Sequence, residues 1–149
     1  MKLSEILTPD VIVAPLKSSN KKHAINELLD VLHEKELVKS REDALKDILT
    51  REKHLSTGME NGLAVPHAKS DSVDKLIIAF GFHREGIEFE SLDGKPAHFI
   101  FLVMSPRDTS GPHIQALASI SRFLKNDDVR QRLLEAPNKD DIYDILCEG

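Results

Sequence analysis

The sequence has 149 residues, of which 40% are hydrophobic and 30% are charged, and its formal net charge is −5. This length and composition are typical of one folded globular domain and exclude a disordered chain, so we expect a single domain over residues 1–149. The mild excess of acid, without clustered Lys and Arg, argues against nucleic acid as a partner.

The single cysteine, Cys147, excludes an internal disulfide and a cysteine-based metal site. No apolar run follows the first residues, so we expect no secretory signal. The longest apolar stretches have the length of strands and are too short to span a membrane. We therefore expect a cytoplasmic location and no insertion into a membrane.

The first third of the chain predicts a brief helical turn at 4–7, a short strand at 11–14 and two helices. The polar residues 18–20 can cap a helix whose apolar residues recur at helical spacing as far as Leu32. Ser40 and Asp43 resemble a capping box, which predicts a second helix beginning there.

The middle third predicts strands. Residues 56–62 are a loop by their local signals, and a short apolar segment then leads to Pro66 and His67. Residues 76–82 and 97–104 have the continuous apolar character of interior strands. Residues 87–89 alternate as a half-exposed strand does, and we place His83 in the turn before them.

The last third predicts three helices, which begin near Pro112, after residues 126–128 and after Asn138. Helices that precede and follow a group of interior strands are typical of the α/β class. We therefore expect a single-domain three-layer α/β/α sandwich with a mixed central sheet.

His67 is the histidine whose surroundings differ most from those of the other six. It follows a Gly-rich loop, and Pro66 directly before it stiffens the backbone. A stiff approach holds an imidazole at a set angle, which suits in-line attack on phosphorus. A neutral imidazole is a competent nucleophile near pH 7, so His67 is a candidate nucleophile, with an idle loop histidine as the alternative.

Metal and nucleotide chemistry are less favoured. The sequence has neither a pair of histidines at helical i, i+4 spacing nor a phosphate-binding Gly-x-x-x-x-Gly-Lys loop. His67, His98 and His113 can still converge in space, so a metal-dependent hydrolase stays open as a third alternative. We expect no cofactor and no metal.

The segment from Arg51 to His67, which contains Ser-Thr-Gly-Met-Glu-Asn-Gly-Leu-Ala-Val-Pro-His, resembles the signature of the fructose/mannitol/nitrogen-regulatory IIA family of the phosphotransferase system. A second element, His113-Ile-Gln-Ala-Leu-Ala, resembles the family's later histidine-led helix. The resemblance covers essentially the whole chain. It implies that His67 accepts a phosphoryl group from the phosphocarrier protein HPr and passes it to a IIB partner.

The resemblance also places Arg51 beside the active histidine and His113 as its supporting histidine. A transferring phosphoryl group carries spread negative charge, which a planar guanidinium neutralises well. His113, expected at a helix N-terminus, can donate a hydrogen bond to phosphate. Ser56 and Thr57 hydroxyls and the N–H groups around Gly58 are further candidate phosphate donors.

Two functions are compatible with these residues. In one, the chain is a phosphotransferase component that serves the uptake of a fructose- or mannitol-type sugar. In the other, it is a nitrogen-regulatory protein, in which phosphorylation of His67 changes which partner binds.

Overall fold

The computed structural model describes residues 2–149, which form a mixed sheet with helices on both faces. β4 and β5 are antiparallel and occupy the middle of the sheet. β1 lies parallel to β4, whereas β2 and β3 follow one another along the other side of β5 and are parallel to it. The strands are β1 (Ile12–Val13), β2 (Leu63–Ala64), β3 (His67–Lys69), β4 (Ile77–Ile87) and β5 (Ala97–Ser105).

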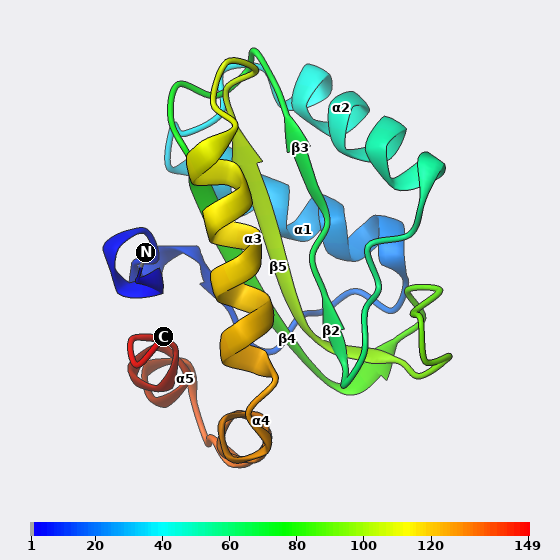
Figure 1. Ribbon diagram of the computed structural model, residues 1–149, viewed down its shortest axis with the longest axis vertical. Helices are drawn as coiled ribbons and strands as arrows, with labels where there is room; N and C mark the ends of the chain where they lie inside the picture. Colours follow the sequence, from blue (N-terminus) through cyan, green and yellow to red (C-terminus); the bar gives the residue numbers. More distant parts are fainter. Residues whose placement is uncertain (1) are drawn as a thin grey trace.

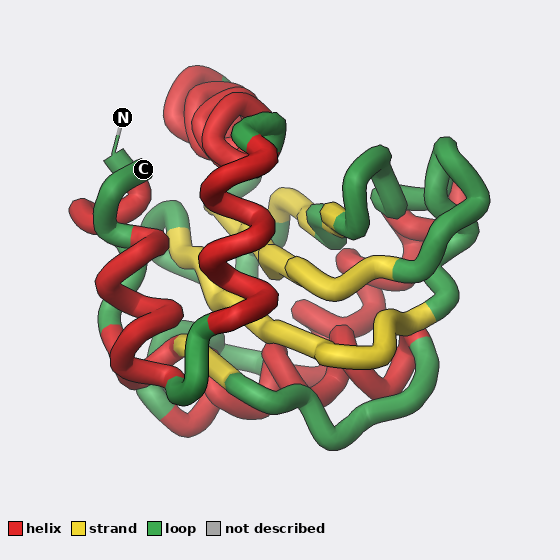
Figure 2. The backbone as a smooth tube through the Cα atoms, turned by 90° about the horizontal axis from the view of Figure 1, so that it is seen from below, coloured by secondary structure: helices red, strands yellow, loops and turns green. Residues whose placement is uncertain are grey.

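The helices complete three layers. α1 and α2 pack on one face of the sheet, against β4 and β3, and α3 packs on the other face against β5 (Figure 1). Figure 2 shows the strands as a layer between the helices. The predicted α/β/α sandwich is confirmed. The helices are α1 (Lys21–Glu34), α2 (Arg41–His54), α3 (Gly111–Leu124), α4 (Asp127–Glu135) and α5 (Lys139–Leu146), and two short 3-10 turns, η1 (Leu3–Glu5) and η2 (Pro9–Val11), precede β1.

Short polar side chains begin four of the helices where the sequence predicts them. At the start of α2 the Ser40 hydroxyl accepts a hydrogen bond from the backbone N–H of Asp43. Such a cap satisfies one of the N–H groups that the first helical turn leaves without a partner. Asn20, Asn126 and Asn138 do the same for α1, α4 and α5.

The hydrophobic core lies on both faces of β4 and β5, since helices cover both. Along β5 every residue except His98 is buried, as is typical of a strand covered on two sides. The rings of Phe80 and Phe101 lie 4.7 Å apart at the centre, in a tilted arrangement that aromatic pairs favour. This rigid centre supports the residues at the ends of the strands.

Two strand predictions were wrong. His83 does not lie in a turn, because β4 continues through it to Ile87 with an irregular register after Phe82. Residues 88–89 lie beyond the end of that strand, although Phe89 is fully buried. The alternating polarity of residues 87–89 thus indicated correctly that Phe89 is buried, but it did not indicate a separate strand.

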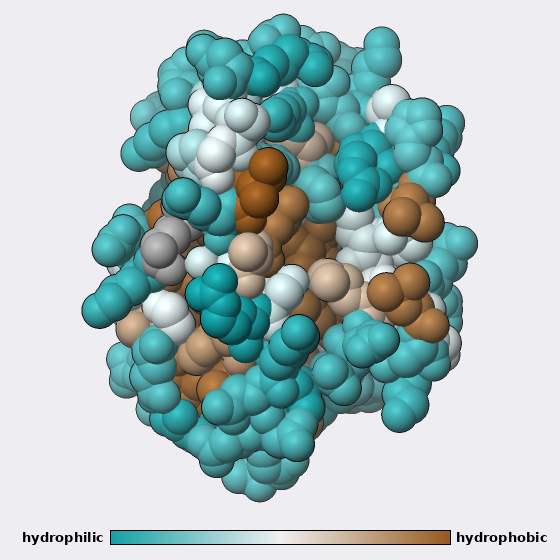
Figure 3. All heavy atoms as spheres, viewed as in Figure 1, coloured by the Kyte–Doolittle hydropathy of each residue, from teal (hydrophilic) through white to brown (hydrophobic). Residues whose placement is uncertain are grey.

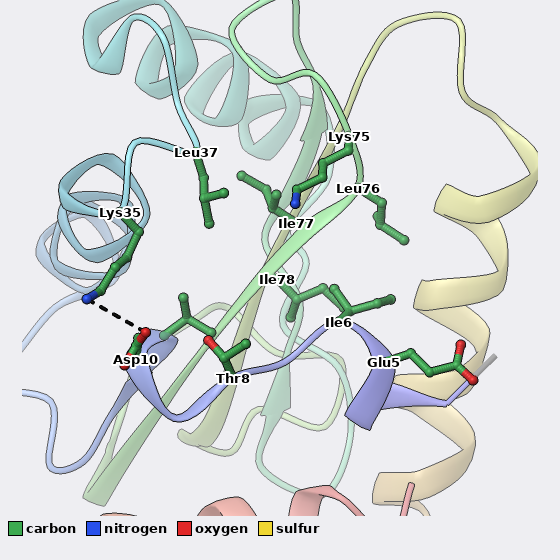
Figure 4. A pocket seen from close by; sticks show the side chains of 11 residues that line it. Glu5, Ile6, Thr8, Asp10, Lys35, Leu37, Lys75, Leu76, Ile77 and Ile78 are labelled. Carbon is green, nitrogen blue, oxygen red and sulfur yellow. Dashed lines mark ion pairs between the residues drawn. The ribbon is translucent and has the colours of Figure 1, made fainter.

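A pocket of about 380 Å³ lies between the N-terminal segment, the end of α1 and the start of β4 (Figure 4). Ile6, Leu37 and Ile78 are among its apolar lining residues, and Lys35 and Asp10 form an ion pair of 3.7 Å at its rim. It belongs to the β1 side of the sheet, whereas β2 and β3 lie on the other side.

Within residues 2–149, the helices are all too short or too polar to cross a membrane.

Candidate active site

His67 is the first residue of β3, which corrects the expectation that it ends a loop. Its strand pairs with β5 in parallel, and the N–H of Val103 donates to the carbonyl oxygen of Pro66 at 3.0 Å. A proline lacks an N–H and suits the position just before a strand at the side of a sheet. The imidazole is therefore carried on sheet backbone and is only half-buried.

A backbone carbonyl determines which nitrogen of His67 is protonated. Nδ1 lies 2.7 Å from the carbonyl oxygen of Val65. A carbonyl oxygen can only accept, so Nδ1 must carry the hydrogen and donate it. In the neutral ring, the lone pair then lies on Nε2, which is the nitrogen available for bond formation.

His113 lies in the first turn of α3, and its ring centroid is 5.5 Å from that of His67, with 59° between the ring planes. Only 6% of His113 is exposed. On one side, its Nδ1 lies 2.6 Å from the hydroxyl oxygen of Ser105, the last residue of β5. The end of β5 and the start of α3 thus hold the second imidazole beside the first.

Arg51 lies in the last turn of α2 and brings a positive charge to the same site. One guanidinium nitrogen, Nη1, donates to the carbonyl oxygen of Leu55 at 2.9 Å, which fixes the side chain across the end of the helix. Arg51 lines both of the pockets that His67 lines. The other N–H groups of the planar guanidinium can then donate to an anion near His67.

The loop that carries Ser56, Thr57 and Gly58 forms a wall of the site, but its donors are engaged within the protein. Thr57 donates from both its N–H (2.7 Å) and its hydroxyl to the carboxylate of Glu52. The Ser56 hydroxyl donates to the carbonyl oxygen of Phe89 and accepts from the N–H of Gly58 at 3.1 Å. These bonds give the loop a fixed shape.

Two pockets meet at His67 and Arg51. One, of about 260 Å³, has mostly apolar walls that include Met59, Leu92 and Leu117. The other, of about 420 Å³, has polar and basic walls, which comprise Asp47, Thr50, His54, Lys69, Arg107 and His113 besides Arg51, His67 and Ala68. His67 is therefore placed between a surface suited to an apolar contact and one suited to negative charge.

Burial lowers the pKa of both imidazoles and so favours their neutral forms. Burial is the main reason that the pKa of His67 is lowered, and the charge of Arg51 adds to this effect, against the Val65 carbonyl and Glu52. Burial, with the charges of His67 and Lys69, lowers the pKa of His113 to about 4. A neutral His67 keeps its lone pair at neutral pH, which a nucleophile requires.

The low pKa of His113 predicts a loss of stability in acid. Between pH about 6.5 and about 4 the unfolded chain binds a proton at this position and the folded chain does not, so the free energy of unfolding should fall as the pH falls. We expect His113→Gln to lose less stability than the wild type between pH 7 and pH 4.5, by up to about 3 kcal/mol, because one unit of pKa corresponds to about 1.4 kcal/mol. Urea unfolding at both pH values measures this; equal losses in the two proteins would contradict it.

The three histidines considered for a metal site do not form one. The Nδ1 of His98, near the start of β5, lies 3.0 Å from the carbonyl oxygen of His83 in the second half of β4. His67 pairs instead with Val103, near the end of β5, and its ring lies beside that of His113. Within residues 2–149 no group of three His, Cys, Asp or Glu side chains is placed to hold a metal ion.

Residues 5–149 match the sequence profile of the family described as phosphoenolpyruvate-dependent sugar phosphotransferase system, EIIA 2. The chain belongs to this family. It is 38% identical over 146 residues to the PTS system fructose-specific EIIA component of Haloferax volcanii, which covers 98% of this chain and 95% of that protein. It is also 38% identical to the fructose-specific EIIABC component of Bacillus subtilis, but it spans only 23% of that longer protein.

Among solved structures, this EIIA 2 chain resembles the nitrogen regulatory protein IIA-Ntr from Neisseria meningitidis. The TM-score is 0.88 at 30% identity, covering 97% of this chain and 98% of that one. The IIA mannitol structure from Escherichia coli gives a TM-score of 0.81 at 25% identity, covering 94% and 98%. Sugar-specific and nitrogen-regulatory relatives therefore share this fold.

The EIIA 2 site also contains residues to which sequence reasoning gave no role. Glu52 holds Thr57, and the Nζ of Lys21 lies 3.6 Å from its carboxylate, so that α1, α2 and the loop are joined. Ser105 contacts His113, and Lys69 lies two residues after His67, on the same face of β3. The adjacency of Glu52 to Arg51 within the motif was the one signal that could have identified any of them.

Proposed function

We propose that this chain is a phosphoryl carrier in which His67 accepts a phosphoryl group from phospho-HPr and transfers it to a IIB partner for the uptake of a fructose- or mannitol-type sugar. The observation that carries the proposal is the bond between Nδ1 of His67 and the Val65 carbonyl, which leaves the Nε2 lone pair free. The family match and the fructose-specific relatives support the phosphotransferase system as the setting.

The transfer needs no cofactor. The Nε2 lone pair of His67 forms a bond to phosphorus while the bond from phosphorus to the donor atom of HPr breaks, and the electron pair of that bond returns to the donor. The second transfer reverses this order with an acceptor atom of the IIB partner. Because the phosphoryl group itself supplies the electrophile, the protein's task is to position it and to neutralise its charge.

We assign the two contacts to the phosphoryl oxygens to Arg51 and His113. Both border the basic pocket together with His67, and neither guanidinium nor imidazole is used up by its bond within the protein. The donors of Ser56, Thr57 and Gly58 are engaged elsewhere, so in this proposal the loop shapes the pocket, and a direct phosphate contact from it requires a protein bond to break first.

A prediction for Arg51 follows. Arg51→Lys should slow phosphorylation of the chain by about tenfold or more, because an ammonium is a point charge and cannot reproduce two parallel hydrogen bonds to phosphate. Arg51→Ala should slow it further, with an unchanged fold. Rapid-quench labelling from phospho-HPr measures both rates. The matched control is Arg122→Lys on the exposed side of α3, and wild-type rates in both Arg51 variants would show that the residue is only surface charge.

Exposed apolar side chains lie beside the site and suit a protein partner. Leu55, Leu92 and Ile114 are 67%, 73% and 63% exposed, and Leu55 and Leu92 line the apolar pocket at His67. Figure 3 shows brown apolar patches beside α3 and at the loops beside β2 and β3, with white and teal residues between them. Apolar side chains at the centre of a polar rim are typical of a protein-binding surface.

Leu92→Asp should therefore weaken docking of phospho-HPr without changing the chemistry. We expect KM for phospho-HPr to rise by about tenfold, as when a central interface residue worth more than 1 kcal/mol is lost, while kcat changes little. Leu92→Met, which keeps the apolar contact, is the control. A change in kcat alone would place Leu92 in the transfer step instead.

A nitrogen-regulatory role is the second candidate. It is favoured by the structural similarity to IIA-Ntr from Neisseria meningitidis at 30% identity. In that role, His67 is phosphorylated by the same chemistry, but the phosphoryl group controls partner binding and does not pass to a sugar.

Reconstitution separates the two candidates. The chain is incubated with phosphoenolpyruvate, the general phosphotransferase enzymes, HPr and one candidate IIB protein at a time, and labelled phosphate is followed from chain to chain. Label that reaches a IIB protein and then a sugar supports transport. Label that stays on this chain with every IIB protein supports regulation, and absence of any label contradicts both.

A further inference from the structure

Ser105 lies where the sheet meets the second histidine. Its side chain is fully buried, and its hydroxyl oxygen is 2.6 Å from Nδ1 of His113. In the parallel pairing of β3 with β5, Ser105 is the partner of Lys69, and His67 is two residues earlier on the same strand. Side chains at these positions point to the same face, so the register itself brings the hydroxyl to the face that carries the histidine pair.

Burial determines the direction of this hydrogen bond. Within residues 2–149 the one hydrogen-bond partner of the Ser105 hydroxyl is Nδ1 of His113. If Nδ1 carried the proton and donated it, the hydrogen of the hydroxyl would have no acceptor in a position closed to water, which is costly. Ser105 must therefore donate, and Nδ1 must accept with its lone pair.

We propose that Ser105 is a positioning residue that fixes His113 in the tautomer with its proton on Nε2 and thereby supplies an N–H donor to the phosphoryl group on His67. The proposal rests on the proposed phosphoryl transfer. In this proposal, the hydrogen bond from Ser105 determines which ring nitrogen of His113 carries the proton.

The two imidazoles are then held in complementary states. The Val65 carbonyl keeps the proton of His67 on Nδ1 and leaves Nε2 with a lone pair, whereas Ser105 keeps the proton of His113 on Nε2. The pKa of His113, lowered to about 4 mainly by burial, agrees with a neutral ring that has one donor and one acceptor. One ring thus attacks phosphorus and the other donates to its oxygens, with no proton exchange between them.

The first experiment determines the tautomer of His113 in the wild-type protein. Long-range nitrogen–proton NMR of the imidazoles at neutral pH separates a protonated from an unprotonated ring nitrogen. We expect His113 to have an unprotonated Nδ1 and a protonated Nε2, and His67 to have the reverse. A proton on Nδ1 of His113 overturns the proposal without any variant and without any transfer assay.

The second experiment removes the hydroxyl. Ser105→Ala should move His113 to a mixture of tautomers and slow phosphorylation by about two- to tenfold, the effect of one hydrogen bond. Ser70→Ala is the matched control, because Ser70 is also fully buried but its hydroxyl donates to Asp47. We expect the His113 tautomer to be unchanged in that variant. If Ser105→Ala does not fold, Ser105→Cys keeps the shape and weakens the donor, with the same expected shift.

A double-mutant cycle shows whether Ser105 acts through His113. In a His113→Ala background, Ser105→Ala should cause no further slowing. An equal loss of rate in both backgrounds, or a Ser105→Ala protein with a mixed tautomer and a wild-type rate, overturns the positioning role. If wild-type protein takes no phosphate from phospho-HPr, the proposed function fails, whereas the tautomer measured by NMR still stands or falls by itself.

Discussion

Replacing His67 by alanine is expected to abolish phosphorylation of the chain by phospho-HPr. Only a side chain with a nucleophilic lone pair can form the bond to phosphorus, and the loss of an enzymatic nucleophile costs on the order of 10⁶ in rate. His67→Gln should be equally inactive, because an amide has a similar polar character but is not a nucleophile. The measurement is incorporation of labelled phosphate from phosphoenolpyruvate through HPr.

A matched control is available in the chain. His33 is an exposed histidine near the end of α1, so His33→Ala should incorporate label like the wild type. Circular dichroism and urea unfolding of His67→Ala should show a folded protein, since His67 is only half-buried and its strand is held by backbone bonds. Full labelling of a folded His67→Ala protein would refute the role of His67.

The helix starts and the two central strands could be predicted from the sequence. Ser40 and Asn138 begin helices as expected, because a cap is a local interaction between residues two or three apart. The apolar runs that became the centre of β4 and β5 were also clear, since burial on both faces leaves few polar residues. The α/β class and the layers followed from the order of these elements.

Contacts between distant residues could not be predicted in the same way. β3 has only three residues, too few to show a period of two, and it is a strand because of its pairing with β5. The bond between Ser105 and His113 depends on how the turn after β5 returns the chain to the sheet. The engagement of the Thr57 donors by Glu52 likewise became visible only in the folded chain.

The site forms where the ends of three secondary-structure elements, α2, β3 and α3, meet. Arg51 lies in the last turn of α2, His67 begins β3 and His113 lies in the first turn of α3. Arg51 and His67 are held by backbone carbonyl groups, and His113 by the buried Ser105 hydroxyl of β5. Residues on rigid elements keep their mutual geometry better than residues on loops, which favours a preorganised site. In the proposed function, the exposed apolar side chains beside the site bind the protein partners.

His113→Ala is expected to slow phosphorylation on the order of 10²–10³, as does the removal of one charge-stabilising donor from a preorganised site. The variant should nevertheless become labelled, because the Nε2 lone pair of His67 is fixed by Val65 and does not depend on His113. His113→Gln, whose amide can donate a hydrogen bond, should recover part of the rate. Rapid-quench labelling gives the rates, and His23→Ala on the exposed side of α1 is the control.

The position of the label decides between the two histidines. In wild type and in His113→Ala, the label should map to His67 and should be acid-labile and base-stable, because it is a phosphoramidate. The 5.5 Å between the ring centroids makes an exchange of roles between the histidines geometrically conceivable, so mapping is needed as well as a rate. Label on His113 in the wild type would reverse the assignment, and an unchanged rate in His113→Ala would reduce His113 to a structural residue. If His113 is the donor held by Ser105 and His67 is the nucleophile held by Val65, His113→Ala must be labelled slowly and on His67.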